Sequence, residues 1–333
     1  MISGENGHGK TNLIEAIAWM SGAGSFRGAP DDALIRVGTD AAIIRATTET
    51  IDQREQLIEV EIPRVGRNRI QVNRQRVTKV GDLAHHMQVT VFSPQDLDLV
   101  KDGPALRRSW IDGAVAARAP RLAGLRSELE RILRQRNALL RSAGGRLDSD
   151  AAFTLDVWDA KLADVGEQVR TTREALLNEM APRLHESYQA VADRSSSVAA
   201  IYQSSWTDSL EKALEQARDI DVRRGVTTVG PHRDEILLTI NDLPARTHAS
   251  QGEQRSLALA MRLAPDQLVR DSGTAAPVLL LDDVFSELDP RRSTALLNAL
   301  PEAQSILTTA APLPPAAVPD SVVTIADSAV VTS

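Results

Sequence analysis

The sequence predicts an α/β fold in which a parallel β-sheet surrounds a phosphate-binding loop and an inserted helical lobe interrupts the chain. Three observations support this prediction. A glycine-rich loop at residues 4–11 opens a helix, and residues 248–309 alternate helices with strands. Between residues 104 and 193, by contrast, the pattern is helical and rich in Ala, Leu, Arg and Glu. The 333 residues are enough for two domains, or for one large domain that carries an insertion.

Composition and charge narrow the function classes. Hydrophobic residues make up 42% of the chain, but no apolar run reaches the length of about eighteen residues that a membrane-spanning helix needs. Cysteine is absent, which excludes disulfides, thiol catalysis and cysteine metal sites and is typical of a reducing cytoplasm. Because the net charge is −7, any nucleic-acid site must be a local basic patch. We therefore expect a cytoplasmic protein with no membrane partner.

Residues 4–11 match the phosphate-loop pattern G-x-x-x-x-G-K-T. The glycines let the backbone fold into a concave nest of N–H donors, and Lys10 can then reach the β- and γ-phosphates of ATP. The Thr11 hydroxyl is placed to bind Mg²⁺. Apolar residues at helical spacing follow, so the positive end of a helix dipole points at the anion. The expected ATP contacts are Gly4, Glu5, Asn6, Gly7, His8, Gly9, Lys10 and Thr11.

Strand-like runs follow the loop, and long helices follow the strands. Alternating β-branched residues predict antiparallel strands and then one buried strand before Ser93. These strands are expected at 42–48, 57–62, 68–73 and 89–92, with a short helix at 82–87. From Pro104 onward the pattern predicts helices, two of which form a hairpin around the turn at 142–145. The helices are expected at 104–117, 120–142 and 151–192, the last kinked or broken at Pro182.

The remainder of the chain returns to mixed elements. Strands are expected within 195–205 and at 226–229, 236–240, 278–281, 305–309 and 322–325, with a turn at 241–242. Helices are expected at 208–218, 253–271 and 290–300. The chain is then a split head, formed by residues 1–103 plus 225–333, with a mainly helical lobe at 104–224 inserted between its halves.

A buried aliphatic strand at residues 278–281 delivers two carboxylates to the ligand edge of the sheet. Asp282 is predicted to hold Mg²⁺ through water, the Walker B role, and Asp283 to polarise the attacking water. A core strand followed by an acidic turn is a common structural alternative, but a phosphate loop in the same chain favours the catalytic interpretation. Asp283 is therefore a predicted catalytic residue, and Asp282 and Thr11 are predicted metal ligands.

A Ser-x-Gly turn, Ser250 to Gly252, opens the helix that precedes this acidic strand. Alone it predicts only a helix N-cap with Glu253 as the capping partner. Its position between the phosphate loop and the acidic strand is the layout of the ABC-type ATPases, in which a second subunit's Ser-x-Gly helix end closes over the γ-phosphate. The predicted fold class is therefore α/β: an ABC-type P-loop ATPase head with an inserted helical lobe. Ser250 and Gly252 are predicted to contact ATP across a dimer.

The motifs resemble those of the RecF family, DNA-repair ATPases of the SMC/Rad50-like branch. The resembling stretches, in family order, are 4–16, 92–97, 103–112, 230–234, 249–257 and 278–289. The resemblance implies an ATP-dependent homodimer with slow, DNA-stimulated hydrolysis. It also implies binding at DNA gaps and single-strand/duplex junctions, with RecO and RecR as partners in loading a recombinase. The expected roles are DNA replication, repair and the SOS response to DNA damage.

The resemblance also carries residue roles. Gln95 takes the position of the loop glutamine near the metal and the attacking water, which makes it a predicted catalytic and metal-site residue. His232 lies in a family motif without a role that we can assign. One departure is that Thr308 and Thr309 stand where ABC proteins usually have a switch histidine.

Two basic stretches are candidate DNA sites. The segment from Arg64 to Lys79 carries six basic residues and no acidic one, and like charges on adjacent strands favour a bound anion. Residues 107–146 carry ten arginines against three acidic residues, for which a solvated helix face is an equal alternative. The predicted DNA contacts are Arg64, Arg67, Arg69, Arg74, Arg76 and Lys79.

Two other functions share part of this pattern. The nucleotide-binding subunit of an ABC transporter has all three ATPase motifs, but it does not explain the arginine-rich hairpin or the helical insertion. A small-molecule P-loop kinase would lack the Ser250–Gly252 element.

The start of the chain is the last expectation. Only three residues precede Gly4, which is too few for the central strand that normally leads into a phosphate loop. We therefore expect the sheet to lack that strand, Met1 to be a misplaced start, and the native protein to extend further upstream.

Overall fold

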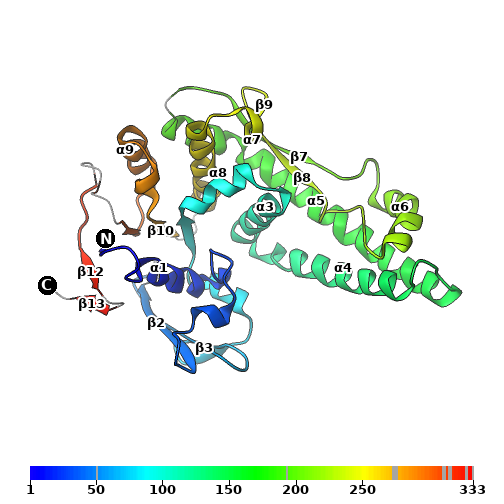
Figure 1. Cartoon of the computed structure of the whole chain (residues 1–333), viewed down its shortest axis with the longest axis horizontal. Coiled ribbons are helices and arrows are strands. Elements are labelled where there is room, and N and C mark those ends of the chain that lie inside the picture. The colour runs from blue at the N-terminus through cyan, green and yellow to red at the C-terminus, as the bar shows by residue number, and fades with distance from the viewer. Residues whose placement is uncertain are drawn as a thin grey trace. The chain divides into compact units, whose positions relative to one another are not determined.

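The computed structural model describes residues 1–49, 52–192, 194–271, 277–309, 313, 317–326 and 329–331. Its contacts divide the chain into two compact units. The sheet unit comprises Met1–Asp96, Ser187–Ser195 and Ala258–Ser333, and the helical unit comprises Leu97–Glu186 and Ser196–Leu257. The domain limits expected from the sequence lie at other residues and stay a prediction. Figure 1 shows the elements of both units.

A mostly parallel sheet is the centre of the sheet unit, as predicted. Among the described residues its strands lie in the order β13-β12-β1-β11-β10-β6, and only the β12–β13 pair is antiparallel. Leu279 and Leu281 of β10 pack with Phe92 on one face, and Leu280 packs with Ile14 of helix α1 on the other. The strands are β1 (Ile2–Ser3), β6 (Val89–Phe92), β10 (Val278–Asp282), β11 (Ser305–Thr308), β12 (Val323–Ala326) and β13 (Ala329–Val331).

The expectation of a missing central strand is wrong. Ile2 and Ser3 form β1, which lies between β11 and β12 and is parallel to both. Ile2 pairs with Thr308 on one side and with Val323 on the other, and its side chain is buried in the core beneath α1. Two residues are sufficient because neighbouring strands pair with both edges of β1 and its apolar side chain is covered.

Helices cover both faces of this sheet. Helix α1 (Lys10–Ala18) contributes Ile14 and Ala18 to one face and runs on into a single π-helical turn, Trp19–Ala23. On the other face, Leu259 and Leu263 of α8 (Gln251–Asp271) and Leu296 of α9 (Pro290–Ala299) pack against β10. The expected α/β layering is thereby confirmed.

A second, antiparallel sheet in the same unit confirms the predicted run of strands and adds one. Its buried face carries Ile58, Val60 and Ile70 and packs against Trp19 and Leu83. The turn between the last two strands places Asn73 and Arg74 at positive φ, which makes a tight hairpin. The strands are β2 (Ala41–Glu49), β3 (Glu55–Pro63), β4 (Arg69–Val72) and β5 (Gln75–Val77), of which β5 was not expected.

The helical unit contains the predicted hairpin of long helices. Helix α4 (Gly124–Ser142) contributes Leu129 and Ile132, and α5 (Ser149–Val191) contributes Leu162 and Val165, to a core that also includes Leu210 of α6. Pro182 lies inside α5 and does not break it. The other helices of this unit are α2 (Asp98–Lys101), α3 (Pro104–Arg118), α6 (Leu210–Arg224) and α7 (Ala245–His248). Its strands are β7 (Val198–Gln203), β8 (Glu235–Ile240) and β9 (Leu243–Pro244).

Short 3₁₀ helices connect several of these elements. The one at 80–85 replaces the short helix expected at 82–87. The others that the structure describes are Asp31–Leu34, Pro94–Leu97, Pro120–Leu122 and Val284–Glu287.

One predicted strand is absent from the described structure. Residues 226–229 are β-branched, but they form a loop whose polar groups bond to side chains instead of a neighbouring strand. The N–H of Thr227 donates to Asn137 Oδ1 (2.8 Å), and the N–H of Thr228 donates to Asp221 Oδ1 (2.9 Å). Side chains that are distant in sequence thus satisfy the backbone groups that a strand ladder would otherwise use.

Candidate nucleotide-binding site

The glycines of the phosphate loop adopt backbone conformations that other residues avoid. Gly4, Gly7 and Gly9 have φ values of 146°, 85° and 98°. A Cβ on Gly4 would lie 2.3 Å from the carbonyl oxygen of Ile325 in β12, so the loop starts where no side chain fits. Gly9 is the left-handed N-cap of α1, and the loop therefore leads directly into the free N–H groups of the first helical turn.

Lys10 is the buried cation of this loop. Its side chain is only 7% exposed, and Nζ donates to the carbonyl oxygens of Gly4 (2.8 Å) and Glu5 (2.9 Å). An ammonium group has three donors, so one remains for a further acceptor. A buried cation requires charge compensation, and the two carbonyl oxygens carry no formal charge. The loop therefore has the cation that a polyphosphate needs.

Asp282 lies beside the loop, although 271 residues separate it from Thr11. Its Oδ1 accepts hydrogen bonds from Thr11 Oγ1 (2.9 Å) and from Thr308 Oγ1 (2.8 Å). The parallel pairing of β10 with β11 places Asp282 opposite Thr308, so the sheet register brings the three groups together. The predicted meeting of the phosphate loop with the acidic strand is present in the geometry.

Asp283 follows at the end of β10 in a left-handed conformation, with φ 50° and ψ 27°. Its N–H donates both to the carbonyl oxygen and to Oγ1 of Thr308, at 3.1 Å in each case. Its Oδ1 is buried and has no hydrogen-bond partner among the described residues. A buried carboxylate oxygen without a donor is suited to accept a hydrogen bond from a water molecule, as the predicted role requires.

Gln95 lies in the short helix that follows β6, and its side chain is exposed. Phe92 at the end of β6 pairs with Leu281 of β10, so the Gln95 segment leaves the sheet at the edge where Asp282 lies. Its neighbour Asp96 is buried and pairs with Arg262 (2.7 Å), which anchors the segment. The predicted role of Gln95 at the metal stays a prediction.

Ser250 and Glu253 form a reciprocal cap at the start of α8, within the helical unit. The N–H and Oγ of Ser250 donate to Glu253 Oε2 at 2.8 and 2.7 Å, and the N–H of Glu253 donates to Ser250 Oγ at 3.3 Å. Ser250 is exposed, and Gly252 follows in the first helical turn. The helix cap is confirmed, whereas the contact with ATP across a dimer stays a prediction.

Comparisons with known proteins settle the family. A model of the RecF/RecN/SMC N-terminal domain matches residues 1–312. The DNA replication and repair protein RecF of Streptomyces avermitilis is 41% identical over 324 residues, which cover 92% of this chain and 86% of the relative. The RecF of Frankia alni is 41% identical over 328 residues, which cover 93% and 86%. The chain belongs to the RecF family.

Solved structures agree with this assignment. The recombination mediator protein RecF with ATP, of the RecFOR pathway, matches with a TM-score of 0.89 and 28% identity over 99% of this chain and 90% of that one. The Smc head domain of Pyrococcus furiosus, bound to the C-terminal domain of ScpA, matches with a TM-score of 0.56 at 17% identity, which shows the fold alone. The predicted resemblance and the ATPase-head fold are thus confirmed. No helix in the described part of the chain is long and apolar enough to cross a membrane.

Thr11 and Asp282 fit a magnesium ion that arrives with a nucleotide. Both offer oxygen ligands within 2.9 Å of each other, and both described hydrogen bonds to Asp282 reach Oδ1, which leaves Oδ2 for a ligand water. Among the described residues no group of three or more His, Asp or Glu side chains could hold a metal. Mg²⁺ in ATPases is commonly held by one or two protein oxygens together with phosphates and water, so the site of this RecF-family chain suits that mode.

The sequence analysis missed two features of the site. Thr308 is fully buried and ties β11 to both acidic residues of β10, although it was noted only because it replaces a histidine. Arg27 pairs with the buried carboxylate of Glu15 on α1 and donates to Asn12 Oδ1 (3.3 Å). That bond to Glu15 raises the pKa of Arg27 above its usual value. No sequence signal indicates this contact, because Arg27 lies in a Gly/Ser-rich turn.

The basic segment from Arg64 to Lys79 is less uniform than its sequence implies. All six of its basic side chains are exposed, but Arg69 pairs with Glu61 of β3 (3.1 Å), and Arg64 donates to the carbonyl oxygen of Thr39 (3.2 Å). The neighbouring strand β3 therefore supplies an acidic counter-charge that a count within residues 64–79 does not include. Within the described residues no ion pair involves Arg67, Arg74, Arg76 or Lys79, which remain the candidate DNA contacts.

The second arginine cluster is largely structural. Arg107 forms an ion pair with Glu235 (2.8 Å), and Arg136 with Asp221 (2.7 Å), so acidic residues distant in sequence neutralise both. Arg118 likewise pairs with the distant Glu179 of α5, and Arg126 and Arg131 pair with the nearby Glu130 and Glu128 of α4. The alternative of a solvated helix face fits the exposed arginines of residues 107–146, whereas Arg107 and Arg136 are buried in ion pairs.

The family motif at residues 230–234, which includes His232, contacts several elements of the helical unit. Arg173 donates to the carbonyl oxygen of Pro231 (2.9 Å), and Arg108 donates to that of Asp234 (2.7 Å). His232 Nε2 bonds the carbonyl oxygen of Thr227 (3.1 Å), while its Nδ1 is buried with no partner among the described residues. These contacts give the motif a structural role in joining α3, α5 and the loop before β8.

Lowering the pH from 7 to 5 should destabilise the fold through His232. Burial lowers the pKa of His232 to about 4, helped by the nearby Arg233, Arg108 and Arg136 and opposed by the hydrogen bond to the carbonyl oxygen of Thr227. Between pH 6.5 and 4 the unfolded chain binds the proton more readily than the folded chain does. The contribution of neutral, buried His232 to the free energy of unfolding is therefore complete above pH 6.5 and is lost as the pH falls toward 4.

We expect His232 to lower the free energy of unfolding by about 1–2 kcal/mol at pH 5 relative to pH 7. Urea unfolding at pH 7 and pH 5 measures it, with His232→Gln compared against His185→Gln at an exposed position. The pH-dependent loss should shrink in His232→Gln alone. An equal loss in both variants would show that His232 is not its source.

Proposed function

We propose that the chain is an ATP-binding protein of DNA replication and repair that uses ATP to form a DNA-binding homodimer. The observation that carries the proposal is the bond from Thr11 Oγ1 to Asp282 Oδ1 beside the buried Nζ of Lys10, which assembles an ATPase site from the two ends of the chain. The relatives named as DNA replication and repair proteins, and a neighbour solved with ATP, support it. The cytoplasm, where DNA and ATP occur together, is the proposed location.

Each residue has a separate task in this proposal. Lys10 and the N–H groups of the loop bind the phosphates, Thr11 and Asp282 hold Mg²⁺, and the ion offsets the phosphate charge when it is bound. Asp283 polarises the attacking water, and Gln95 helps to position it. The exposed cap at Ser250 meets the γ-phosphate of a second copy. Hydrolysis is slow and opens the dimer.

The proposed DNA target is a gap or a single-strand/duplex junction, and RecO and RecR are the proposed partners in loading recombinase. A neighbour described as a recombination mediator of the RecFOR pathway supports this assignment. Transport is not supported, because the matching relatives with 39% to 41% identity are RecF proteins. The proposed contacts to the DNA backbone are the exposed residues Arg67, Arg74, Arg76 and Lys79.

Ser250→Arg should leave ATP affinity of the monomer nearly intact and remove ATP-dependent dimerisation. The reason is that the bulky cation lies at the proposed closing surface, while the residues of the phosphate loop belong to the sheet unit and are unchanged. Sedimentation with and without ATP measures the effect, and Ser209→Arg, at the N-cap of α6, is the matched control. Dimers that persist in Ser250→Arg would mean that the element is only a helix cap.

Mixing inactive variants tests the shared site directly. In a dimer of Lys10→Ala with Ser250→Arg, one of the two proposed composite sites retains both an intact loop and an intact Ser250. We expect the mixture to regain part of the hydrolysis that each variant lacks alone. A mixture as inactive as its components would contradict closure across the dimer.

Replacing Arg67, Arg74 and Arg76 with Gln should weaken DNA binding for all sequences alike. The slope of log affinity against log salt should fall by roughly 0.9 for each lost duplex phosphate contact. Arg69→Gln is the control, because Glu61 already occupies its guanidinium. Fluorescence anisotropy over a salt series measures the slopes. An unchanged slope in the triple variant would place the DNA elsewhere.

A further inference from the structure

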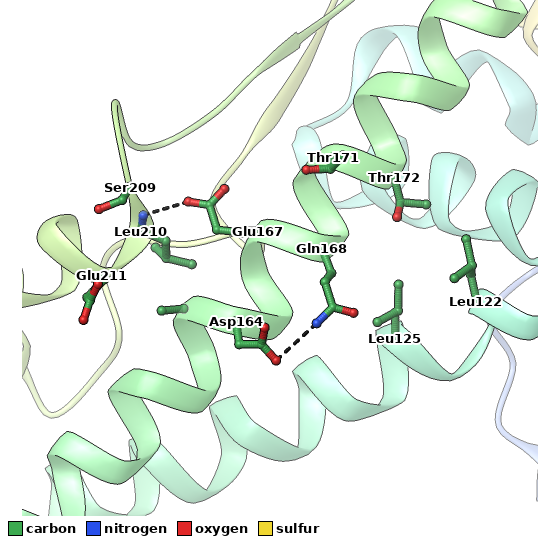
Figure 2. A pocket seen from close by; sticks show the side chains of 11 residues that line it. Leu122, Leu125, Asp164, Glu167, Gln168, Thr171, Thr172, Ser209, Leu210 and Glu211 are labelled. Carbon is green, nitrogen blue, oxygen red and sulfur yellow. Dashed lines mark hydrogen bonds between the residues drawn. The ribbon is translucent and has the colours of Figure 1, made fainter.

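The helical unit has an open hollow of about 540 Å³ that the proposed ATPase function does not use. Figure 2 shows α5 between two flanking elements, with Leu122 and Leu125 on one side and Leu210 and Glu211 on the other. The hollow therefore lies along α5, between the N-terminal ends of α4 and α6. Its lining combines leucines with carboxylates, and Asp164 of α5 lies among them.

The hollow continues an exposed stripe of α5. Phe153 and Val157, which are 71% and 41% exposed, precede Asp164 on the same helix. Residues 153, 157, 160, 164, 168 and 171 recur every three or four positions, so they share one face. From residue 153 to residue 171 this face is about 27 Å long. An exposed phenylalanine in line with an open hollow is a feature of binding surfaces rather than of a solvated helix.

Two carboxylates of the hollow are not neutralised. Among the described residues neither Asp164 nor Glu211 has an ion pair, and Asp164 accepts only a hydrogen bond from Gln168 Nε2 (3.2 Å). Glu167, in contrast, is engaged by Trp206 Nε1 (3.1 Å) and by the N–H of Leu210 (2.8 Å).

Three basic side chains near the hollow have partners of their own. Arg126 pairs with Glu130 (3.0 Å), Arg170 pairs with Glu167 (2.9 Å), and Lys161 lies over the ring of Trp158 (5.1 Å). The surface therefore presents apolar side chains next to unpaired negative charge.

We propose that this surface, formed by the α5 stripe and the hollow, binds an amphipathic helix of a protein partner that carries lysine or arginine beside its apolar face. A helix suits the length of the stripe, and its apolar side chains would cover Phe153, Val157 and the leucines. Its cations would approach Asp164 and Glu211. Unpaired carboxylates repel phosphate, so nucleic acid does not fit this surface.

A labelled peptide pair tests the proposal with the full chain. The probe is a fluorescein-labelled helical peptide of about eighteen residues with leucines on one face and lysines beside them, and its partner has glutamate in place of lysine. Fluorescence anisotropy measures binding of each peptide to the wild type, to Asp164→Lys/Glu211→Lys and to Phe153→Ser. Glu302→Lys/Asp320→Lys changes the charge equally on exposed residues of the sheet unit and is the control.

We expect the lysine peptide to bind the wild type and the control alike. Its affinity should fall about tenfold or more for both Asp164→Lys/Glu211→Lys and Phe153→Ser. The glutamate peptide should bind only Asp164→Lys/Glu211→Lys. ATP affinity and thermal unfolding should be unchanged throughout, which separates this proposal from that of the ATPase function.

Three results would overturn the proposal. Equal binding to all variants would show only general attraction to an acidic protein. A lysine peptide that does not bind the wild type would remove the assigned chemistry. Self-association of the wild type that Phe153→Ser abolishes would show that a second copy covers this surface.

Discussion

Lys10→Ala is expected to abolish ATP binding, whereas Asp283→Asn keeps binding, stops hydrolysis and accumulates the dimer. The two residues differ in where they act. Lys10 supplies the buried cation of the phosphate loop, and its loss leaves the phosphates without charge compensation. Asp283 lies at the end of β10, and its Oδ1 has no hydrogen-bond partner in the part of the chain that the structure describes. Replacement by asparagine should therefore change the proposed polarisation of water and leave the phosphate loop intact.

Nucleotide binding and sedimentation of both variants measure this difference. Lys212→Ala, at an exposed lysine of α6, is the control for removal of one positive charge and should bind ATP like the wild type. In the proposed function the dimer opens only after hydrolysis, so Asp283→Asn should sediment as a dimer with ATP. Equal loss of ATP binding in Lys10→Ala and Asp283→Asn would contradict the separate roles.

Arg136→Met should cost the helical unit about 3–5 kcal/mol of unfolding free energy, because it breaks a buried ion-pair network. Arg136 is fully buried and bonds Asp159 Oδ1 (2.6 Å), Asp221 Oδ2 (2.7 Å) and Thr227 Oγ1 (2.9 Å). The apolar substitution leaves the carboxylate of Asp221, itself fully buried, without its cation. The same network holds the 226–229 loop, so the loss should spread to the motif around His232.

Arg134→Met on the exposed face of α4 is the matched control and should change stability by about 0.5 kcal/mol or less. Urea unfolding followed by tryptophan fluorescence suits the comparison, because Trp110, Trp158 and Trp206 lie in the helical unit. Similar midpoints for the two variants would mean that the buried network contributes little to stability.

Local patterns predicted the parts of the site that depend on neighbouring residues. The spacing of glycines and Lys10 predicts the loop, and a run of four aliphatic residues predicts β10 and the edge at which Asp282 and Asp283 emerge. The register of parallel strands then explains why Thr11 meets Asp282. These predictions succeed because the physical cause lies within a few residues of the pattern.

Contacts between distant residues account for what the sequence could not predict. The sequence of residues 107–146 has a large excess of positive charge. In the structure, however, Arg107 forms an ion pair with Glu235 and Arg136 with Asp221, and both acidic residues lie far along the chain. The β-branched run at 226–229 predicts a strand. It forms a loop instead, because the side chains of Asn137 and Asp221 accept hydrogen bonds from its backbone N–H groups. In the same way, the short β1 forms because two strands from the other end of the chain flank it.

ATP hydrolysis by the purified protein, measured with and without gapped DNA, tests most directly whether this chain is an ATP-gated DNA-binding protein. We expect slow hydrolysis that gapped DNA stimulates, no hydrolysis in Lys10→Ala, and weaker stimulation in the variant that lacks Arg67, Arg74 and Arg76. Hydrolysis that DNA does not change, or that Lys10→Ala retains, would contradict the proposed function.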